Sequence, residues 1–143
     1  MTNVAQVLGD KVHQAVYTIR PDSTVLEAIS LMAEKGIGAL VVTHEDSVVG
    51  ILSERDYTRK IALMQRTSFD TTVNEIMTPK VITVTSATSV EDCLALMTDR
   101  HLRHLPVVEN DKLIGLISIG DLVKAAMGDQ RKLIDQLQQY ISG

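Results

Sequence analysis

The chain has 143 residues, a length that suits one globular domain with its own core. Apolar residues make up 45% of it and charged residues 22%, and the only aromatic side chains are three tyrosines and one phenylalanine, so the core must be aliphatic. The formal net charge of −4 argues against a nucleic-acid-binding protein, which needs a basic surface to contact phosphates.

The single cysteine, Cys93, excludes an intrachain disulfide, and its place on an apolar helix face indicates a packed thiol in the core. No apolar run approaches the roughly 18 residues of a membrane-spanning helix. The N-terminal segment Met1–Val4 lacks the basic and apolar stretches of a secretory signal. We therefore expect a cytoplasmic protein that contacts neither a membrane nor nucleic acid.

The first half of the chain predicts a β-α-β-β-α unit, with a short helix at Val4–Leu8 leading into a strand at Tyr17–Ile19. The next helix begins with a capping-box pattern, Thr24 and Glu27, and has an apolar face with helical spacing: Val25, Ala28, Ile29 and Met32. A hairpin follows, with strands at Ala39–Thr43 and Val48–Leu52 around the turn Glu45-Asp46-Ser47. A second helix at about Glu54–Leu63 completes the unit.

The second half repeats this unit 65 residues later. Residues 16–60 align without a gap on residues 81–125, and eleven of the 45 aligned pairs are identical, including Gly50/Gly115, Ser53/Ser118 and Asp56/Asp121. The predicted leading helix is Val73–Met77, and the first strand is Ile82–Val84. The next helix is capped by Ser89 and Asp92 and has the apolar face Val90, Cys93, Leu94 and Met97. A hairpin follows, with strands at Leu105–Val108 and Leu113–Ile117 around the turn Asn110-Asp111-Lys112, and the last helix is Ile119–Met127.

One unit of roughly 45 residues buries too little surface to be stable alone. We therefore expect an α/β fold of the α+β type, in which the two copies pack sheet against sheet about a pseudo-twofold axis as one domain. Copy one spans about residues 4–63, a polar linker spans 64–72, and copy two spans about 73–127. A separate helix is predicted at residues 129–141 from an apolar stripe: Leu133, Ile134, Leu137 and Ile141.

The repeated polar motif reads Gly50-Ile-Leu-Ser53-Glu-Arg-Asp56 in copy one and Gly115-Leu-Ile-Ser118-Ile-Gly-Asp121 in copy two. One interpretation is structural, because Ser is a good helix N-cap and Asp in the first turn suits the helix dipole. The other is functional. A helix N-terminus offers N–H groups and a hydroxyl to an anion, and a carboxylate can accept hydrogen bonds from two neighbouring hydroxyls, as on a ribose. The pattern leaves both interpretations open.

A second polar cluster, His101-Leu-Arg103-His104-Leu-Pro106, leads into a strand of copy two. Arg103 and His104 suit contact with phosphates, and the alternative is a solvated pair at a strand edge. Two histidines three residues apart, without cysteine or carboxylate partners, do not predict a metal site. Copy one has Gly36-Ile-Gly38-Ala39 at these positions, which predicts a helix C-cap and turn, or room for a flat base.

Three basic residues, Arg55, Arg59 and Lys60, crowd the start of the second helix of copy one. Solvated positions explain them best, except for Arg55, which lies inside the Ser-x-x-Asp segment. No Ser-His-Asp, Cys-His or paired-carboxylate set can be assembled from the chain. We therefore expect no enzyme activity, no catalytic residue, no metal and no required cofactor.

These motifs resemble those of the CBS-domain family, named after cystathionine β-synthase, over about residues 4–127. The matching pieces are Val-x-Thr near the start of each copy, Gly-Ile-Leu-Ser-Glu-Arg-Asp, Arg-His-Leu-Pro-Val-Val and Gly-Leu-Ile-Ser-Ile-Gly-Asp. The chain is similar to a stand-alone CBS pair, also called a Bateman module. The resemblance implies a regulatory module that binds AMP, ADP, ATP, NAD or S-adenosylmethionine in two clefts related by the pseudo-twofold axis.

The resemblance also implies roles for particular residues. Asp56 and Asp121 would each hold a ribose, with Ser53 and Ser118 beside them. The cleft of Asp121 would include Gly120 and would place Arg103 and His104 at the phosphates. Ile37, Gly38 and Tyr17 would frame the adenine there. The cleft of Asp56 would include Leu102, Ile82 and Lys80, with Arg55 near the phosphates.

The two predicted clefts are unequal. Copy one has Gly38 and Ala39 where copy two has Arg103 and His104, so by analogy the Asp56 cleft lacks a basic pair for phosphates. We therefore expect the Asp121 cleft to bind a nucleotide more tightly.

CBS pairs commonly dimerise, so the resemblance implies a homodimer, for which the helix faces and the C-terminal stripe supply apolar surface. The alternative to a ligand-binding sensor is a structural or adaptor domain, whose clefts stay empty and whose dimer surface binds a separate protein partner.

Overall fold

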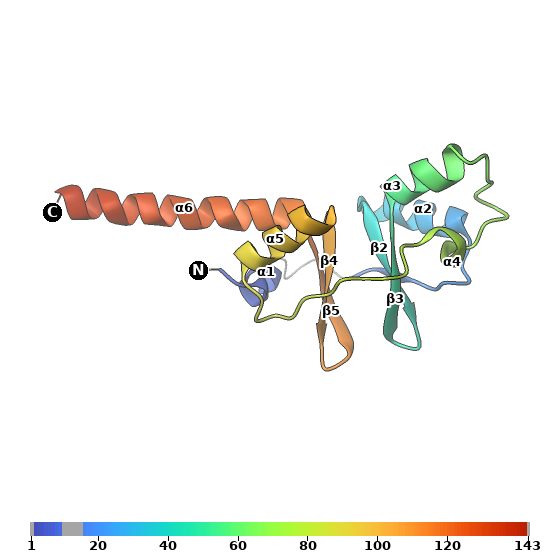
Figure 1. Cartoon of the computed structure of the whole chain (residues 1–143), viewed down its shortest axis with the longest axis horizontal. Helices are drawn as coiled ribbons and strands as arrows, with labels where there is room; N and C mark the ends of the chain where they lie inside the picture. The colour runs from blue at the N-terminus through green and yellow to red at the C-terminus, as the bar shows by residue number, and fades with distance from the viewer. Residues whose placement is uncertain (1, 10–15, 143) are drawn as a thin grey trace. The chain divides into compact units, whose positions relative to one another are not determined.

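The computed structural model describes residues 2–9 and 16–142, whose helices and short strands form two compact units (Figure 1). Unit 1 comprises Met1–Ala15, Thr83–Glu109 and Ile114–Gly143, and unit 2 comprises Val16–Ile82 and Asn110–Leu113. Two small sheets with accompanying helices confirm the predicted α/β fold class.

Unit 2 contains a three-stranded sheet in the order β1-β2-β3. β1 (Thr18–Ile19) pairs in parallel with β2 (Ala39–His44), which pairs antiparallel with β3 (Ser47–Ser53). The two-residue turn between β2 and β3 requires positive φ angles, and Glu45 (49°) and Asp46 (67°) adopt them. The predicted strands of copy one are therefore confirmed, with small shifts at their ends.

Helix α2 (Val25–Lys35) packs on this sheet. Thr24 caps its start, because its hydroxyl oxygen accepts a hydrogen bond from the N–H of Glu27 at 3.2 Å. Gly36 ends it in the left-handed conformation at a φ of 66°, which confirms the predicted C-cap. The core of unit 2 is aliphatic, as composition required: Val25, Ala28, Met32, Leu40, Val42, Leu52, Ile61, Val73 and Ile76.

The second helix of copy one has two parts. α3 (Glu54–Asp56) leads into a π-helical segment, η1 (Tyr57–Ala62), and the short helix α4 (Val73–Ile76) follows further along the chain. The sequence predicted a helix here but not its π-helical part, because the apolar spacing over so few residues does not distinguish an α-helix from a π-helix.

Unit 1 contains α1 (Val4–Gly9), α5 (Val90–Arg100) and α6 (Ile119–Ser142), together with the strand β4 (His104–Glu109) and most of β5 (Lys112–Ser118). α1 matches the leading helix predicted for copy one, and the other elements match those predicted for copy two, except at two places described next.

The strand predicted at Ile82–Val84 is reduced to a single bridge, in which Val84 pairs in parallel with Val107. Pro106 explains the difference: its carbonyl accepts a hydrogen bond from the N–H of Val84 at 3.0 Å, but proline has no N–H with which to extend the ladder. Copy one has Val41 at this position, and there the pairing covers two residues of β1.

The prediction of two separate C-terminal helices was wrong, because α6 runs unbroken through 24 residues. It joins the segment predicted at Ile119–Met127 to the one predicted at residues 129–141. Gly128 lies at the junction, where a Cβ would meet nothing within 4 Å. A glycine inside a helix weakens the helix without ending it.

Each short leading helix packs on the other copy. α1 precedes copy one in sequence, yet it lies in unit 1, where the N–H of Val4 donates to the carbonyl of Thr88 at 2.9 Å. α4 precedes copy two, yet it lies in unit 2, where the N–H of Val73 donates to the carbonyl of Ser23 at 2.8 Å. Ser23 and Thr88 are equivalent positions, so the same contact is made twice.

This exchange explains why both copies share a glycine in their last strand. A Cβ on Gly50 would lie 2.4 Å from Met77 Sδ and 3.2 Å from the carbonyl oxygen of Thr78. A Cβ on Gly115 would lie 2.5 Å from Leu8 Cδ2. In both units the neighbour belongs to the leading segment of the other copy, so the strand needs a residue without a side chain where that segment packs on it.

We expect Gly115→Ala to lower the free energy of unfolding by about 1–3 kcal/mol, the usual cost of added volume at a packed site. Urea unfolding measures the loss, and Gly9→Ala is the matched control because a Cβ there meets nothing within 4 Å. In a Leu8→Ala background the cost should shrink, since the clashing methyl groups are gone. An equal cost in both backgrounds would contradict the contact.

We expect Gly128→Ala to raise the free energy of unfolding by about 0.5–1 kcal/mol, because alanine favours the helix and restricts the unfolded chain. Thermal unfolding followed by circular dichroism at 222 nm measures both stability and helix content. A less stable variant would show that α6 does not continue through residue 128 in solution.

Candidate functional site

The repeated motif of copy one forms a capping box at the start of α3. The N–H of Ser53 donates to Asp56 Oδ2 at 2.9 Å, and the N–H of Asp56 donates to Ser53 Oγ at 3.2 Å. Ser53 Oγ also donates to Asp56 Oδ2 at 3.1 Å. The structural interpretation of the motif is therefore confirmed in copy one.

Copy two has the same box at the start of α6. The N–H of Ser118 donates to Asp121 Oδ2 at 2.9 Å, and the N–H of Asp121 donates to Ser118 Oγ at 3.2 Å. Gly120, between them, is exposed, which leaves the backbone of this first turn accessible. The two Ser–Asp boxes thus share both bonds between backbone N–H groups and side chains, and the same spacing of serine and aspartate.

The start of the first hairpin strand lies beside the box in each unit. In unit 2 the N–H of Glu54 donates to the carbonyl of Gly38 at 3.0 Å. In unit 1 the N–H of Ile119 donates to the carbonyl of Arg103 at 2.9 Å, and His104 begins β4 directly afterwards. The basic pair of copy two therefore lies beside its Ser–Asp box, where copy one has glycine and alanine.

In both boxes the capping bonds engage the Oδ2 atom of the carboxylate, and a carboxylate has about four acceptor sites in all. Asp56 Oδ1 lies 3.8 Å from Lys60 Nζ, and the same ammonium donates to the carbonyl of Ile76 at 2.9 Å. Sequence analysis missed this role and assigned Lys60 to the solvated face. Copy two has Ala125 at the equivalent position, so the two boxes differ in charge here as well.

The side chain of Tyr17 is partly buried against the core of unit 2, and Lys35 Nζ lies 5.4 Å from the centroid of its ring. The resemblance implied that the Tyr17 ring contacts the adenine. The Lys35 ammonium lies over the ring surface on which a base would stack. Ile37 also packs against the core, whereas Arg55 and Lys80 are exposed.

The predicted site residues fall into two groups. Unit 2 contains eight of them: Tyr17, Ile37, Gly38, Ser53, Arg55, Asp56, Lys80 and Ile82. Unit 1 contains six: Leu102, Arg103, His104, Ser118, Gly120 and Asp121. The resemblance assigns members of both groups to each cleft, and that assignment stays a prediction.

Cys93 is fully buried on α5, as predicted for a core thiol. Burial raises the pKa of this thiol, and the charge of Asp92 adds to the effect. A buried thiol with a raised pKa is a poor nucleophile. Within residues 2–9 and 16–142, no group of three or more His, Cys, Asp or Glu side chains is arranged to hold a metal ion.

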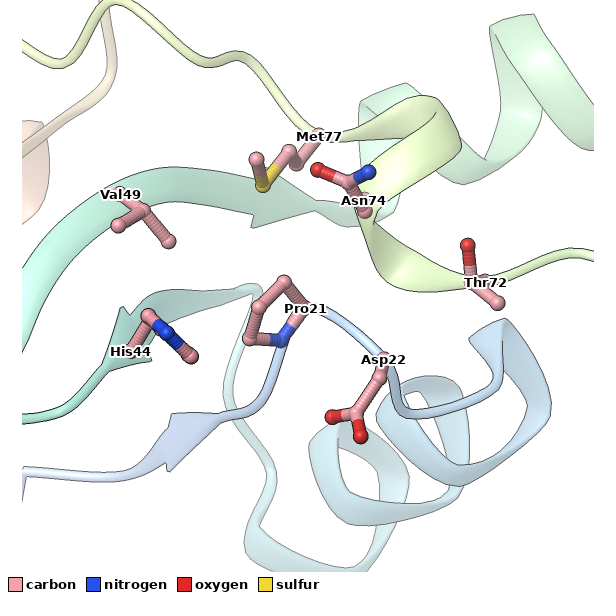
Figure 2. A pocket seen from close by; sticks show the side chains of 7 residues that line it. All are labelled: Pro21, Asp22, His44, Val49, Thr72, Asn74 and Met77. Atoms are coloured by element: carbon pink, nitrogen blue, oxygen red, sulfur yellow. The ribbon is translucent and has the colours of Figure 1, made fainter.

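A surface pocket of about 460 Å³ in unit 2 was not indicated by any sequence motif (Figure 2). It lies at the His44 end of β2, whereas the Ser–Asp box lies at the opposite end, beside Gly38. Figure 2 shows Val49 and Met77 above the ring of Pro21, with Asp22 on the other side. None of the predicted site residues lines the pocket: Pro21, Asp22, His44, Val49, Thr72, Asn74 and Met77.

The equivalent position of unit 1 holds a hydrogen-bonded pair. Both the hydroxyl and the N–H of Ser86 donate to Glu109 Oε1, and these bonds, the hydroxyl's first, lower the pKa of Glu109. Copy one has Pro21 and His44 at these positions, and proline offers neither donor. The pocket therefore occurs where the two copies differ.

Two successive stretches of the chain, residues 5–63 and 73–128, match the profile of the CBS domain. Since these matches cover most of the sequence, the chain belongs to the CBS-domain family, as its motifs implied. A curated relative, the mitochondrial CBS domain-containing protein CBSX3 of Arabidopsis thaliana, is 42% identical over 127 residues, which are 85% of this chain and 62% of that protein. YhcV of Bacillus subtilis is 31% identical over 85% of this chain and 86% of its own.

Solved structures share the fold. A putative signal-transduction protein with CBS domains from Burkholderia ambifaria is 52% identical, with a TM-score of 0.85 and coverage of 90% of this chain and 96% of that one. CBSX2, solved in complex with AMP, is 26% identical, with a TM-score of 0.72 and coverage of 91% and 99%. In the part of this chain that the structure describes, no helix is long and apolar enough to span a membrane.

Proposed function

We propose that this chain is a regulatory module that binds an adenosine-containing ligand: AMP, ADP, ATP, NAD or S-adenosylmethionine. The observation that carries the proposal is the duplicated Ser–Asp box beside a strand start, in a chain of the CBS-domain family. The complex of CBSX2 with AMP supports it. The proposed module is not an enzyme and requires no cofactor.

The chemistry of the box suits a ribose. A carboxylate that accepts a hydrogen bond from the serine N–H is fixed in orientation, and a carboxylate is the side chain that can accept charge-assisted hydrogen bonds from two adjacent hydroxyls. The N-terminus of α6, a helix of 24 residues, favours negative charge nearby and so suits a phosphate attached to that ribose.

We assign the tighter site to copy two. Arg103 and His104 lie beside its box, where they can meet phosphates, whereas Gly38 and Ala39 lie beside the box of copy one. Lys60 also lies near the carboxylate of Asp56, so a ribose there competes with an existing cation. The same proposal includes the further contacts implied by the resemblance: Ile37, Gly38 and Tyr17 at one base, Leu102, Ile82 and Lys80 at the other, and Arg55 near the phosphates of the Asp56 cleft.

An adaptor is the second candidate function, favoured by apolar surface on the segment that joins the two copies. Met64 and Phe69 in this linker, and Leu63 directly before it, are each more than 60% exposed. Exposed apolar side chains that lie close together suit a protein partner. In the adaptor role the module would act on a separate protein, and in either role we propose that it is cytoplasmic.

A saturating adenosine ligand should raise the midpoint of thermal unfolding. At a ligand concentration about 100 times Kd, binding to the folded state adds about 2.7 kcal/mol to the free energy of unfolding. Scanning calorimetry with AMP, ADP, ATP, NAD and S-adenosylmethionine measures the shift, with GMP as the control for the base. No shift with any adenosine compound would contradict ligand binding and favour the adaptor.

Asp121→Asn should weaken AMP binding about tenfold or more, because a hydrogen bond to a charged group is worth about 1.5–3 kcal/mol. Asparagine keeps one side-chain oxygen for the cap, so the helix start is preserved. Titration calorimetry compares this variant with Asp56→Asn, the matched change in the other box, which should have the smaller effect. Equal losses would contradict the assignment of the tighter site to copy two.

A further inference from the structure

The pocket of unit 2 lies at the opposite end of β2 from the Ser–Asp box, so the proposed ribose site does not account for it. Its volume of about 460 Å³ falls within the range of roughly 300–1,000 Å³ that is usual for small-molecule pockets. Pro21 and Val49 belong to copy one, whereas Asn74 and Met77 belong to the leading segment of copy two. A molecule in this pocket would therefore contact both parts of the chain.

The apolar walls of the pocket suit a flat ring. The side chains of Val49 and Met77 lie on one side, and the ring of Pro21 lies on the other (Figure 2). All three residues are half-buried, and Val49 and Met77 also pack against the core of unit 2, which supports their positions. A planar ring between the two walls would contact apolar surface on both faces, and a methionine thioether makes favourable contacts with aromatic rings.

The amide of Asn74 adds a hydrogen-bonding group to these walls. Its side chain is exposed and lies next to Met77 in Figure 2. Among the residues that the structure describes, none forms a hydrogen bond with this side-chain amide. Because an amide carries a donor and an acceptor side by side, it pairs best with a ligand that offers the same two groups along one edge.

The two ionisable side chains of the lining each have a neighbour of the opposite type. Arg20 Nε and Nη2 donate to the carboxylate of Asp22, at 3.1 Å to Oδ1 and 3.2 Å to Oδ2. His44 Nε2 lies 3.9 Å from Glu45 Oε1. A charged ligand would have to compete with these pairs, whereas an uncharged ligand leaves both of them intact. The pocket therefore favours an uncharged molecule.

Unit 1 makes the same backbone contact with different side chains. The N–H of Asn74 donates to the carbonyl of Pro21 at 2.9 Å, and the N–H of Ala5 donates to the carbonyl of Ser86 at 2.9 Å. The position of the amide is thus occupied by alanine in unit 1, and the Ser86–Glu109 pair replaces the proline ring and the imidazole. The groups that would recognise a ligand are therefore particular to unit 2.

We propose that the pocket of unit 2 binds an uncharged planar aromatic compound with an amide, or a similar donor–acceptor edge, on its ring. The ring lies between Pro21 and Met77, and its polar edge meets the amide of Asn74. Such a ligand joins copy one to α4 within unit 2. The site is separate from the Ser–Asp boxes, so it does not depend on the binding of an adenosine compound.

Benzamide is a suitable probe, because it combines an uncharged flat ring with an amide. In methyl NMR spectra, benzamide at millimolar concentration should move the signals of Val49 and Met77 in a saturable manner. Benzoate has the same ring with a charge, and cyclohexanecarboxamide has the same amide without a flat ring, so both should bind more weakly. Signals that do not move with benzamide, or that move equally with all three compounds, would overturn the proposal.

Two variants test the lining itself. Asn74→Ala installs the residue of unit 1 and should weaken benzamide binding about two- to tenfold, the usual effect of one lost hydrogen bond. Gln139→Ala is the matched control, because it removes an exposed amide from unit 1.

The double variant Pro21→Ser with His44→Glu installs the hydrogen-bonded pair of unit 1 and should abolish binding. Thermal unfolding of this variant checks that it is folded. Benzamide affinity that is unchanged in Asn74→Ala, or in the folded double variant, would overturn the assignment of the ligand to this pocket.

Discussion

The fold depends on one exchange: each copy completes its core with a leading segment that precedes the other copy in sequence. In unit 2, Val73 and Ile76 of α4 belong to the buried core, and the N–H of Val25 donates to the carbonyl of Thr71 at 2.9 Å. In unit 1, Val4 and Val7 of α1 are buried beside copy two. Neither copy would keep this packing if it were expressed with its own leading helix alone. A tandem arrangement is therefore a physical requirement of the fold, not only a trace of duplication.

The same exchange positions the Ser–Asp boxes. Gly50 and Gly115 admit the leading segment against the last strand of each hairpin, and three residues later that strand ends at the serine of the box. The box in turn begins a helix whose first N–H is bonded to the start of the neighbouring strand. Each box therefore lies where the end of one strand, the start of the neighbouring strand and the start of a helix are held together by backbone hydrogen bonds.

Much of this was predictable from sequence because it depends on local chemistry. The hairpins, the helix caps and the Ser–Asp motif depend on side chains within a few residues of one another. Because the unit is repeated, each of these patterns occurs twice in the sequence. The exchange was not predictable, because apolar periodicity shows which residues of a leading helix are buried but not which copy buries them. Lys60 was misread for a related reason: its partners include a carbonyl, that of Ile76, and a backbone acceptor leaves no mark in sequence. The separate C-terminal helix was wrong because Gly128 weakens a helix without interrupting it.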